Sequence, residues 1–526
     1  MSTLLHEVAV DFSGGGTFET DGTVGALVGY TVAGLAAFTV GDLGTAIVSP
    51  EDVSTRVLAE PGVSAERGRS AIASQSPPLA NETTFALDNR SGDYSPAAGS
   101  PLYPNVDVGH AARWRILAGA TTYPVAHGYV TELVPRAEWG GQSVAFRALS
   151  QLARLVGKTG YSSPLYGDGT QANGVRTSVA LGYVLDAAGL TDTGLRNFDV
   201  GDTILNWFWI RPTDELFDLA LRIWASEGPG ARLYDDASGK TTFKRRGAEA
   251  AEARSNSVQA TFRDTDDGAD PWFASWDPAS GEQNIVNRCS IAHVRRAVDA
   301  ADAAFWSFGA TVTLGASEAR PFQVQPTGDD PIASVVALAA GTDYTVTAGS
   351  LASAVFDRTS GPFVTLTLTA GAGGATLTGL QVRGKLARVA ATTQVSDTGV
   401  DTAASRARYG PKPLTVPTLG ELDYLVAQSI CNGYVTRGML PRPTAVIEVP
   451  LATDVLIAGA LPREVADRIA VINGRAAFAR QMWVESVKVV AGGGRSARAY
   501  LGCEGAFDTG YGLWGSGLWN TAKWGV

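Results

Sequence analysis

Residues that interrupt regular structure are spread along the whole of this chain. Its 526 residues include 61 glycines and 25 prolines, so the chain turns often. Short runs with the alternation and residue types of β strands lie between the turns, for example at 83–87 and 113–117. At roughly 150 residues per domain, the chain has room for about three to four domains. We therefore predict a multi-domain fold that is mainly β with α+β insertions.

We place five units along the chain. Strand-like runs dominate the first and third units, helical periodicity appears in the second and fourth, and the last unit has a composition of its own. The units are residues 1–155 (β), 156–255 (α+β), 256–390 (β), 391–509 (α+β) and 510–526 (a Trp/Gly-rich tail).

Apolar periodicity and capping residues predict three helices. These helices are 178–188, capped by Thr177 or Ser178 and stopped by Gly189; 214–227, capped by Thr213; and 418–431, with Thr418 and Glu421 as a capping box. A hairpin is expected at 232–245, after the second helix. A proline-containing linker is expected at 391–417, before the third.

The charge balance argues against nucleic acid as the main ligand. The chain has 42 Lys and Arg against 52 Asp and Glu, a net charge of −10, whereas a surface that neutralises phosphates is basic. No Lys or Arg precedes Arg56, so no secretory signal is expected. The uncharged stretch 23–41 is long enough to cross a bilayer, but its glycines and its acidic flanks favour two strands. No stable membrane anchor is expected.

Residues with catalytic or metal-binding chemistry are few and scattered. The three cysteines form no C-x-x-C pair, and the four histidines have no i, i+3 or i+4 partner; they are Cys289, Cys431, Cys503, His6, His110, His127 and His293. The acidic cluster 264–270 lacks the register of a calcium loop, because its glycine, Gly268, comes one position early. We therefore predict no catalytic residues, no metal site and no cofactor.

One stretch near the N-terminus is more specific than the rest. It runs Phe85-Ala86-Leu87-Asp88-Asn89-Arg90-Ser91-Gly92-Asp93-Tyr94-Ser95-Pro96 and continues through Ser100-Pro101-Leu102-Tyr103-Pro104-Asn105-Val106 to Gly109 and Ala112-Arg113-Trp114-Arg115. It resembles the N-terminal part of minor tail proteins from long-tailed bacteriophages, especially the tail-tip or baseplate hub protein. The resemblance continues, in order, at 128–131, 216–245, 284–288, 421–442 and 445–449.

The resemblance implies a structural virion protein built from antiparallel β-barrel or sandwich domains. Such a hub closes the tail tube as a homo-oligomeric ring, a trimer, and takes part in host attachment without catalysis. Its implied partners are the distal tail protein, the tape-measure protein, and tail fibres or receptor-binding proteins. DNA would pass through its channel without specific binding. The implied location is the distal end of the phage tail, after synthesis in the host cytoplasm.

The C-terminal unit places a tryptophan at every fifth position. Five residues turn a helix by about 140° and an odd step changes sides in a strand, so the rings share neither a helix face nor a strand face. We expect these large apolar side chains to dock against a partner. They are Tyr511, Leu513, Trp514, Leu518, Trp519 and Trp524. Three readings stay open, namely another subunit or tail component, a strand packed on the parent domain, or stacking on sugar.

Other functions also stay open at this stage. A carbohydrate-binding adhesin of the tail tip would use the C-terminal tryptophans as platforms for sugar rings. A distal tail ring protein is β-rich in the same way as a hub. A cell-wall hydrolase with a carboxylate pair would not reveal itself, because the sequence gives no distances between its acids.

Overall fold

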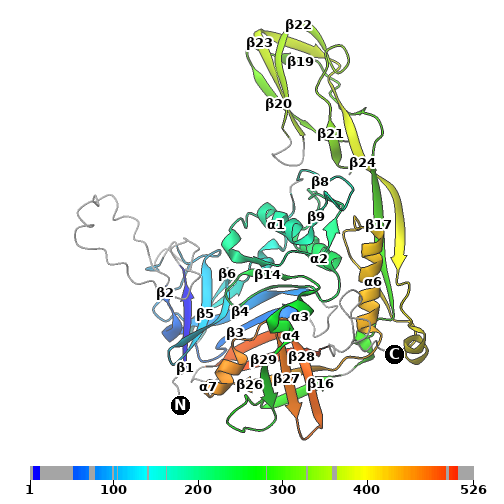
Figure 1. Cartoon of the computed structure of the whole chain (residues 1–526). Coiled ribbons are helices and arrows are strands. Elements are labelled where there is room, and N and C mark those ends of the chain that lie inside the picture. Colours follow the sequence, from blue (N-terminus) through cyan, green and yellow to red (C-terminus); the bar gives the residue numbers. More distant parts are fainter. Residues whose placement is uncertain are drawn as a thin grey trace.

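The computed structural model describes residues 4–11, 51–69, 77–96, 100–102, 105–138, 141–160, 163–279, 281–326, 330–357, 364–492 and 497–506. These residues form a broad body and a narrow arm that projects from it (Figure 1). The body combines a large sheet with a smaller unit of helices and short strands. Each of the three parts has a hydrophobic core of its own.

A 13-stranded sheet, which we call the large sheet, organises the body. It brings together strands from both ends of the chain, and nearly all of its pairs are antiparallel. In spatial order the strands are β16 (Ser275–Ala279), β26 (Thr444–Pro450), β29 (Ala497–Gly505), β28 (Phe478–Ala491), β3 (Val63–Arg69), β4 (Pro78–Asp88), β7 (Gly141–Leu149), β6 (Thr121–Glu138), β5 (Ala111–Ala118), β1 (Leu4–Val10) and β2 (Glu51–Asp52), with β27 (Arg468–Asn473) on β28 and β15 (Val258–Arg263) on β27.

Alternation along these strands explains the core of the large sheet. In β5 the buried residues Ala112, Trp114 and Ile116 alternate with partly exposed arginines, as expected for a strand with one covered face. On the neighbouring pair β4–β7, Phe85 and Phe146 stack with ring centroids 5.0 Å apart. Helix α7 (Asp454–Ala460) contributes apolar side chains to the same core.

The second core belongs to what we call the helical module. Its helices are α1 (Thr177–Ala187), α2 (Leu216–Glu227), α3 (Ala248–Ala251), α4 (Ala253–Asn256), α5 (Ala403–Tyr409) and α6 (Tyr424–Gly438). Its short strands are β8 (Tyr166–Gly167), β9 (Val175–Arg176), β10 (Arg196–Phe198), β11 (Ile204–Leu205), β12 (Trp207–Phe208), β13 (Arg232–Asp235), β14 (Thr241–Lys244) and β25 (Pro413–Val416). The expected hairpin is confirmed, since Leu233 pairs with Phe243 and Tyr234 with Thr242.

The first two predicted helices exist, but their predicted caps are wrong. Helix α1 ends before Gly189 as expected, whereas the Thr177 hydroxyl donates to the buried carboxylate of Glu227 at 2.6 Å instead of capping the helix. Helix α2 begins at Leu216, not at Asp214. The residues before it form a separate turn, in which the Asp214 carboxylate accepts a hydrogen bond from the backbone of Arg211.

The third predicted helix is displaced toward the C-terminus. Asp423 caps α6 by accepting from the backbone N–H of Leu425 at 2.8 Å. Glu421 lies 3.5 Å from Arg296 and does not serve in a capping box. The helix then continues through Gly433, where a Cβ atom would lie 2.8 Å from the ring of Pro229. Close packing explains this glycine, which follows the predicted end of the helix at 431.

A two-stranded ribbon joins the arm to the body. The ribbon, which we call the neck, consists of β17 (Arg288–Val298) and residues 387–396 of β24 (Gln381–Ser396), and at its foot β25 pairs with β17 at 288–291. The arm covers residues 303–386 and contains β18 (Ala303–Ser307), β19 (Val312–Leu314), β20 (Ala319–Val324), β21 (Ile332–Val335), β22 (Thr345–Asp357), β23 (Val364–Thr378) and the first part of β24. Its core is built from alternate residues of β23 and their neighbours.

Two patterns of the sequence differ from the structure in this region. Residues 376–382 alternate as one strand would, but Gly379 has a φ of +67° and turns the chain between β23 and β24. Residues 391–417 are not an open linker, since they contain the end of β24, α5 and β25. The mainly β architecture is confirmed, whereas the division into five units stays a prediction. In the described part of the chain, no helix has the length and apolarity that a membrane crossing requires.

Candidate functional site: the charged junction and the arm

The six predicted docking residues all fall in 507–526, outside the described residues. They are Tyr511, Leu513, Trp514, Leu518, Trp519 and Trp524. Their role therefore stays a prediction.

Two of the histidines, His127 and His293, have defined contacts with their surroundings. Burial, together with the nearby Arg113, lowers the pKa of His127 to about 4. His293 contacts the Thr393 hydroxyl and the edge of the Tyr424 ring. In the described ranges, no group of three His, Cys, Asp or Glu side chains is placed to hold a metal ion.

The acidic cluster 264–270 forms a self-contained turn. Asp267 accepts hydrogen bonds from the backbone N–H groups of Ala269 and Asp270, and Asp266 accepts from Gly268. Arg263 pairs with Asp270 at 2.6 Å. These contacts use the carboxylates within the cluster.

A polar cavity of about 260 Å³ lies between the hairpin β13–β14 and residues 464–467. Its charged side chains are engaged in pairs, Arg254 with Asp467 at 2.5 Å and Lys244 with Glu252 at 2.8 Å. Asp236 lies on its wall and accepts from the backbone of Ser238 and Lys240, which fixes the hairpin turn. The cavity thus lies among structural ion pairs.

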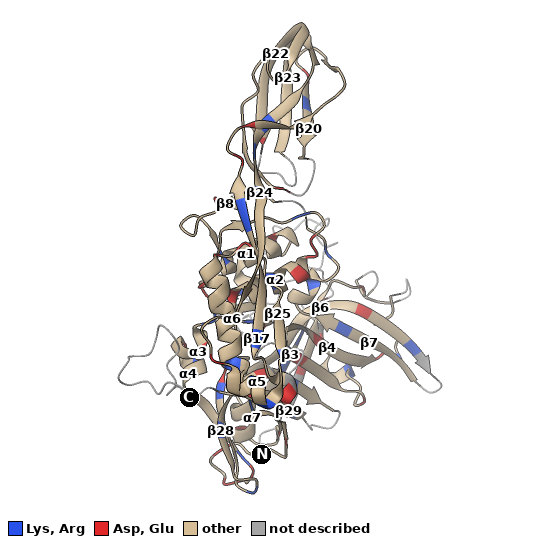
Figure 2. Cartoon of the chain, turned by 90° about the vertical axis from the view of Figure 1, so that its right-hand side faces the viewer, with Lys and Arg blue, Asp and Glu red and all other residues tan. Residues whose placement is uncertain are grey.

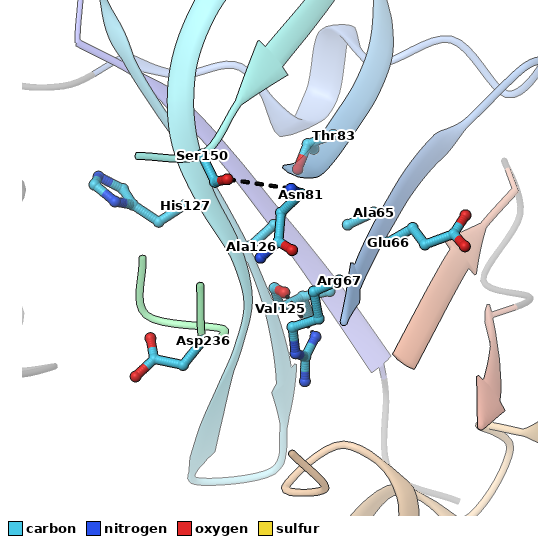
Figure 3. A pocket seen from close by; sticks show the side chains of 10 residues that line it. All are labelled: Ala65, Glu66, Arg67, Asn81, Thr83, Val125, Ala126, His127, Ser150 and Asp236. Atoms are coloured by element: carbon cyan, nitrogen blue, oxygen red, sulfur yellow. Dashed lines mark hydrogen bonds between the residues drawn. The ribbon is translucent and has the colours of Figure 1, made fainter. Parts of the chain in front are cut away.

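A smaller hollow adjoins this cavity (Figure 3). There Arg67 binds Glu464 at 3.0 Å, and the Ser150 hydroxyl accepts from the backbone N–H of Asn81. Burial raises the pKa of Glu464, although Arg67 opposes this effect. The side-chain amide of Asn81 donates to the carbonyl of Asp235 at 2.5 Å, which ties the large sheet to the hairpin of the helical module.

A larger set of buried charges lies where the large sheet meets the helical module, and we call it the junction. It contains four arginines and three glutamates: Arg69, Arg232, Arg437, Arg442, Glu249, Glu485 and Glu504. Glu485 of β28 is fully buried and binds Arg69 of β3 at 2.9 Å and Arg232 of β13 at 2.5 Å. Arg232 also binds Glu249 of α3 at 2.9 Å, and Glu249 in turn binds Arg437 of α6.

Electrostatics show how strongly these groups depend on one another. Burial raises the pKa of Glu249, but Arg437 and Arg232 outweigh burial and hold it below its usual range. Burial lowers the pKa of Arg69 to about 10, and Arg232 adds to the shift. Removing one partner of such a pair leaves the other charge buried without compensation.

The arrangement can fix an orientation, because every pair joins two different elements. A buried ion pair tolerates few geometries, whereas apolar surfaces can slide. β3, β28, β13, α3 and α6 are therefore held in one relative position. The sequence reasoning missed this junction, since its members lie on or next to six elements that are spread along the chain from β3 to β29. The available signal was a charged residue within an apolar strand, such as Glu485 in β28.

The arm differs from the body in its surface. Few of its residues are charged, as Figure 2 shows, and much of β22 is exposed. Arg383 binds the buried carboxylate of Asp343 at 2.5 Å, which ties β24 to the turn before β22. The arm therefore presents small and hydroxylated side chains on a sheet that is stable through its own core.

No family model and no curated protein sequence matches this chain. The structure is similar to several solved tail proteins, among them the three that follow. A 43 kDa tail protein of prophage MuSo2 from Shewanella oneidensis is 12% identical, with a TM-score of 0.43, over 84% of this chain and 93% of that one. A tail protein from Neisseria meningitidis is 10% identical, with a TM-score of 0.43, over 84% and 91%. Prophage tail protein gp18 from Listeria monocytogenes is 9% identical, with a TM-score of 0.36, over 86% and 91%.

Proposed function

We propose that this chain is a structural subunit of a phage-type tail, located at the tail tip as a baseplate hub. One observation carries the proposal. Four of the segments that resemble minor tail proteins in sequence, 85–88, 112–115, 128–131 and 445–449, lie in four strands of one sheet, β4, β5, β6 and β26, although they are up to about 360 positions apart; the segments 216–245, 284–288 and 421–442 lie outside this sheet. A chance resemblance gives no reason for such distant segments to meet in one sheet.

The architecture suits a load-bearing part. The junction holds the large sheet and the helical module in one orientation, and the arm extends from this body with a weakly charged surface (Figure 2). The net charge of −10 suits a channel that DNA passes without binding. In this proposal the protein is non-enzymatic and needs no cofactor.

The assembly around the subunit is also part of the proposal. The body would join copies of itself into a trimer that closes the tail tube, with the distal tail protein on one side. Tail fibres or receptor-binding proteins would attach on the other side, and the tape-measure protein would end at the hub.

Immunogold electron microscopy tests the proposal. Antibody raised against this chain should label tailed particles of the host that carries the gene, with gold confined to the distal end of the tail. Labelling along the tail or at the head end would contradict a hub. Absence of label from particles that contain a control tail-tube protein would contradict any role in the virion.

A zymogram on host cell wall provides an independent control for the non-enzymatic assignment. The purified full-length chain should leave the wall intact under conditions in which lysozyme clears it. Clearing by this chain would replace the structural proposal with a hydrolase.

A further inference from the structure

The neck is exposed on both faces over part of its length. All seven residues of β24 from Arg388 to Gln394 are exposed, although successive residues of a strand point to opposite faces. A two-stranded ribbon alone is marginally stable in water. This stretch therefore lacks the covering that the rest of β24 receives from the arm and from α6.

One edge of the same stretch is also open. β17 pairs with one edge of β24, and β21 pairs with the other edge only at 384–386. Among the described strands, none pairs with the second edge beyond Ala387. Residues 389–396 contain no charge and no proline, which are the devices that normally protect an edge strand. The projecting part of β6, by contrast, carries Glu132, Pro135 and Arg136.

The described chain ends close to the foot of the neck. The backbone N–H of Gly505 donates to the carbonyl of Pro443 at 2.8 Å, and Glu504 binds Arg442 at 3.4 Å. The C-terminal end of β29 therefore lies beside the C-terminal end of α6. From there α6 follows the neck, since its Cys431 thiol contacts the carbonyl of Val395 and its Tyr424 ring contacts His293.

The remaining residues are long enough to reach the open edge. Helix α6 has 15 residues, which span about 22 Å at 1.5 Å per residue. Residues 507–526 follow Ala506 and extend to at most about 66 Å. Trp514, eight residues after Ala506, can reach about 26 Å and Trp519 about 43 Å, so both can pass the length of α6 and arrive at the exposed part of the neck.

The chemistry of the tail suits an edge with two open faces. Leu513 and Trp514 are adjacent, as are Leu518 and Trp519, so in an extended segment each pair sends one large apolar side chain to either face. Apolar groups are available on both faces of the neck. Val389 pairs with Arg296, which puts it on the same face as Val298, and the two valines are 47% and 40% exposed. The other face carries His293 and its contact Tyr424, which is followed by Leu425, 70% exposed.

We infer that residues 507–526 add an extended segment to the open edge of β24 at 389–394 in the same chain, with their leucines and tryptophans covering both faces of the neck. This selects the second of the three readings that the sequence left open, and it does not depend on the proposed function. The segment would convert the two-stranded neck into three strands and stiffen the attachment of the arm.

Hydrogen–deuterium exchange on the purified chain tests the inference. In the full chain, the amides of 389–394 that face the open edge should exchange at least tenfold more slowly than in a chain truncated after Ala506. A full-length variant with the six residues 511, 513, 514, 518, 519 and 524 changed to Ser should behave like the truncated chain. Equal exchange at 389–394 in all three proteins would overturn the inference.

Two controls keep the result specific. Amides of β23 should be protected equally in every variant, which shows that the arm is folded. A full-length variant with Asp508→Asn and Lys523→Gln, which removes the charges of the tail but keeps its apolar side chains, should retain the protection at 389–394. Loss of protection in that variant would contradict docking through apolar groups.

A mixing experiment distinguishes a tail that docks on its own chain from a tail that docks on a second copy. An isotopically labelled truncated chain, mixed with unlabelled full chain, should stay unprotected at 389–394, because each tail serves its own neck. Protection of the labelled chain would show exchange of tails between copies and would overturn the assignment to the same chain.

Discussion

Glu485→Gln is the substitution that tests the junction most directly. The glutamate is fully buried, and each of its carboxylate oxygens binds a different arginine, Arg232 at 2.5 Å and Arg69 at 2.9 Å. Glutamine keeps the shape but loses the charge, and its NH₂ group faces a guanidinium donor. The guanidinium groups of Arg69 and Arg232 then stay buried without the negative charge of Glu485 beside them. Breaking a buried pair in this way costs about 3–5 kcal/mol of unfolding free energy.

The assay is equilibrium denaturant unfolding of the purified chain, with Glu448→Gln as the matched control. Glu448 also lies in the large sheet and binds an arginine, Arg498, at 2.6 Å, but that arginine is largely exposed. An exposed pair contributes about 0–1 kcal/mol. The difference between the two variants therefore isolates burial, because both remove one carboxylate from a strand of the same sheet.

A second variant checks the sign of the effect. Adding Arg69→Met to Glu485→Gln removes one of the two uncompensated cations, so the double variant should be more stable than Glu485→Gln alone. If Glu485→Gln costs no more than Glu448→Gln, or if the double variant is less stable still, the junction does not hold the body together through buried charge.

Three further predictions concern other parts of the molecule. Because the pKa of His127 is lowered from its ordinary 6.5 to about 4, its neutral form stabilises the fold above pH 6.5. That contribution, about 2–3 kcal/mol, is lost as the pH falls toward 4. The difference in unfolding free energy between wild type and His127→Gln should therefore shrink by this amount between pH 7 and pH 4. A difference that stays constant with pH would contradict this. Gly239→Ala should cost clearly more than Gly268→Ala in melting temperature, since both glycines have positive φ but only at Gly239 would a Cβ meet a neighbour, the His127 ring; equal losses would contradict the argument. Leu368→Ala should lower the stability of the arm by about 2–5 kcal/mol while amide exchange in β28 stays unchanged; coupled loss would show that the arm has no independent core.

Local patterns predicted the elements better than the contacts between them. The hairpin 232–245 followed from the apolar residues on either side of a short turn, and its register is as expected. The helix caps failed, because Thr177 and Glu421 are drawn to the distant partners Glu227 and Arg296. Propensity describes what a residue does in the absence of such partners. Tertiary contacts decided the outcome here.

The candidate site was the least predictable part for a related reason. Arg69 and Glu485 are more than four hundred positions apart, and only the order of strands in the large sheet makes β3 and β28 neighbours. The sequence shows a charged residue in an apolar strand but does not show which charge will meet it. The tryptophan-containing tail differs from the junction, because its composition is easy to notice in the sequence but its residues lie outside the described ones.

The helical module is attached to the large sheet in a different way from that in which the arm is attached to the body. This difference predicts how the molecule moves. The helical module is held by buried charge pairs that tolerate few geometries, with Glu485 and Glu249 each bridging two elements. The arm is held by two strands whose edge and faces are open at 388–394. Resistance to local opening follows the number of buried contacts. We therefore expect motion to concentrate in the neck, with the body acting as one rigid piece. A segment added at the edge of β24 would limit that motion, because it would add contacts where few exist.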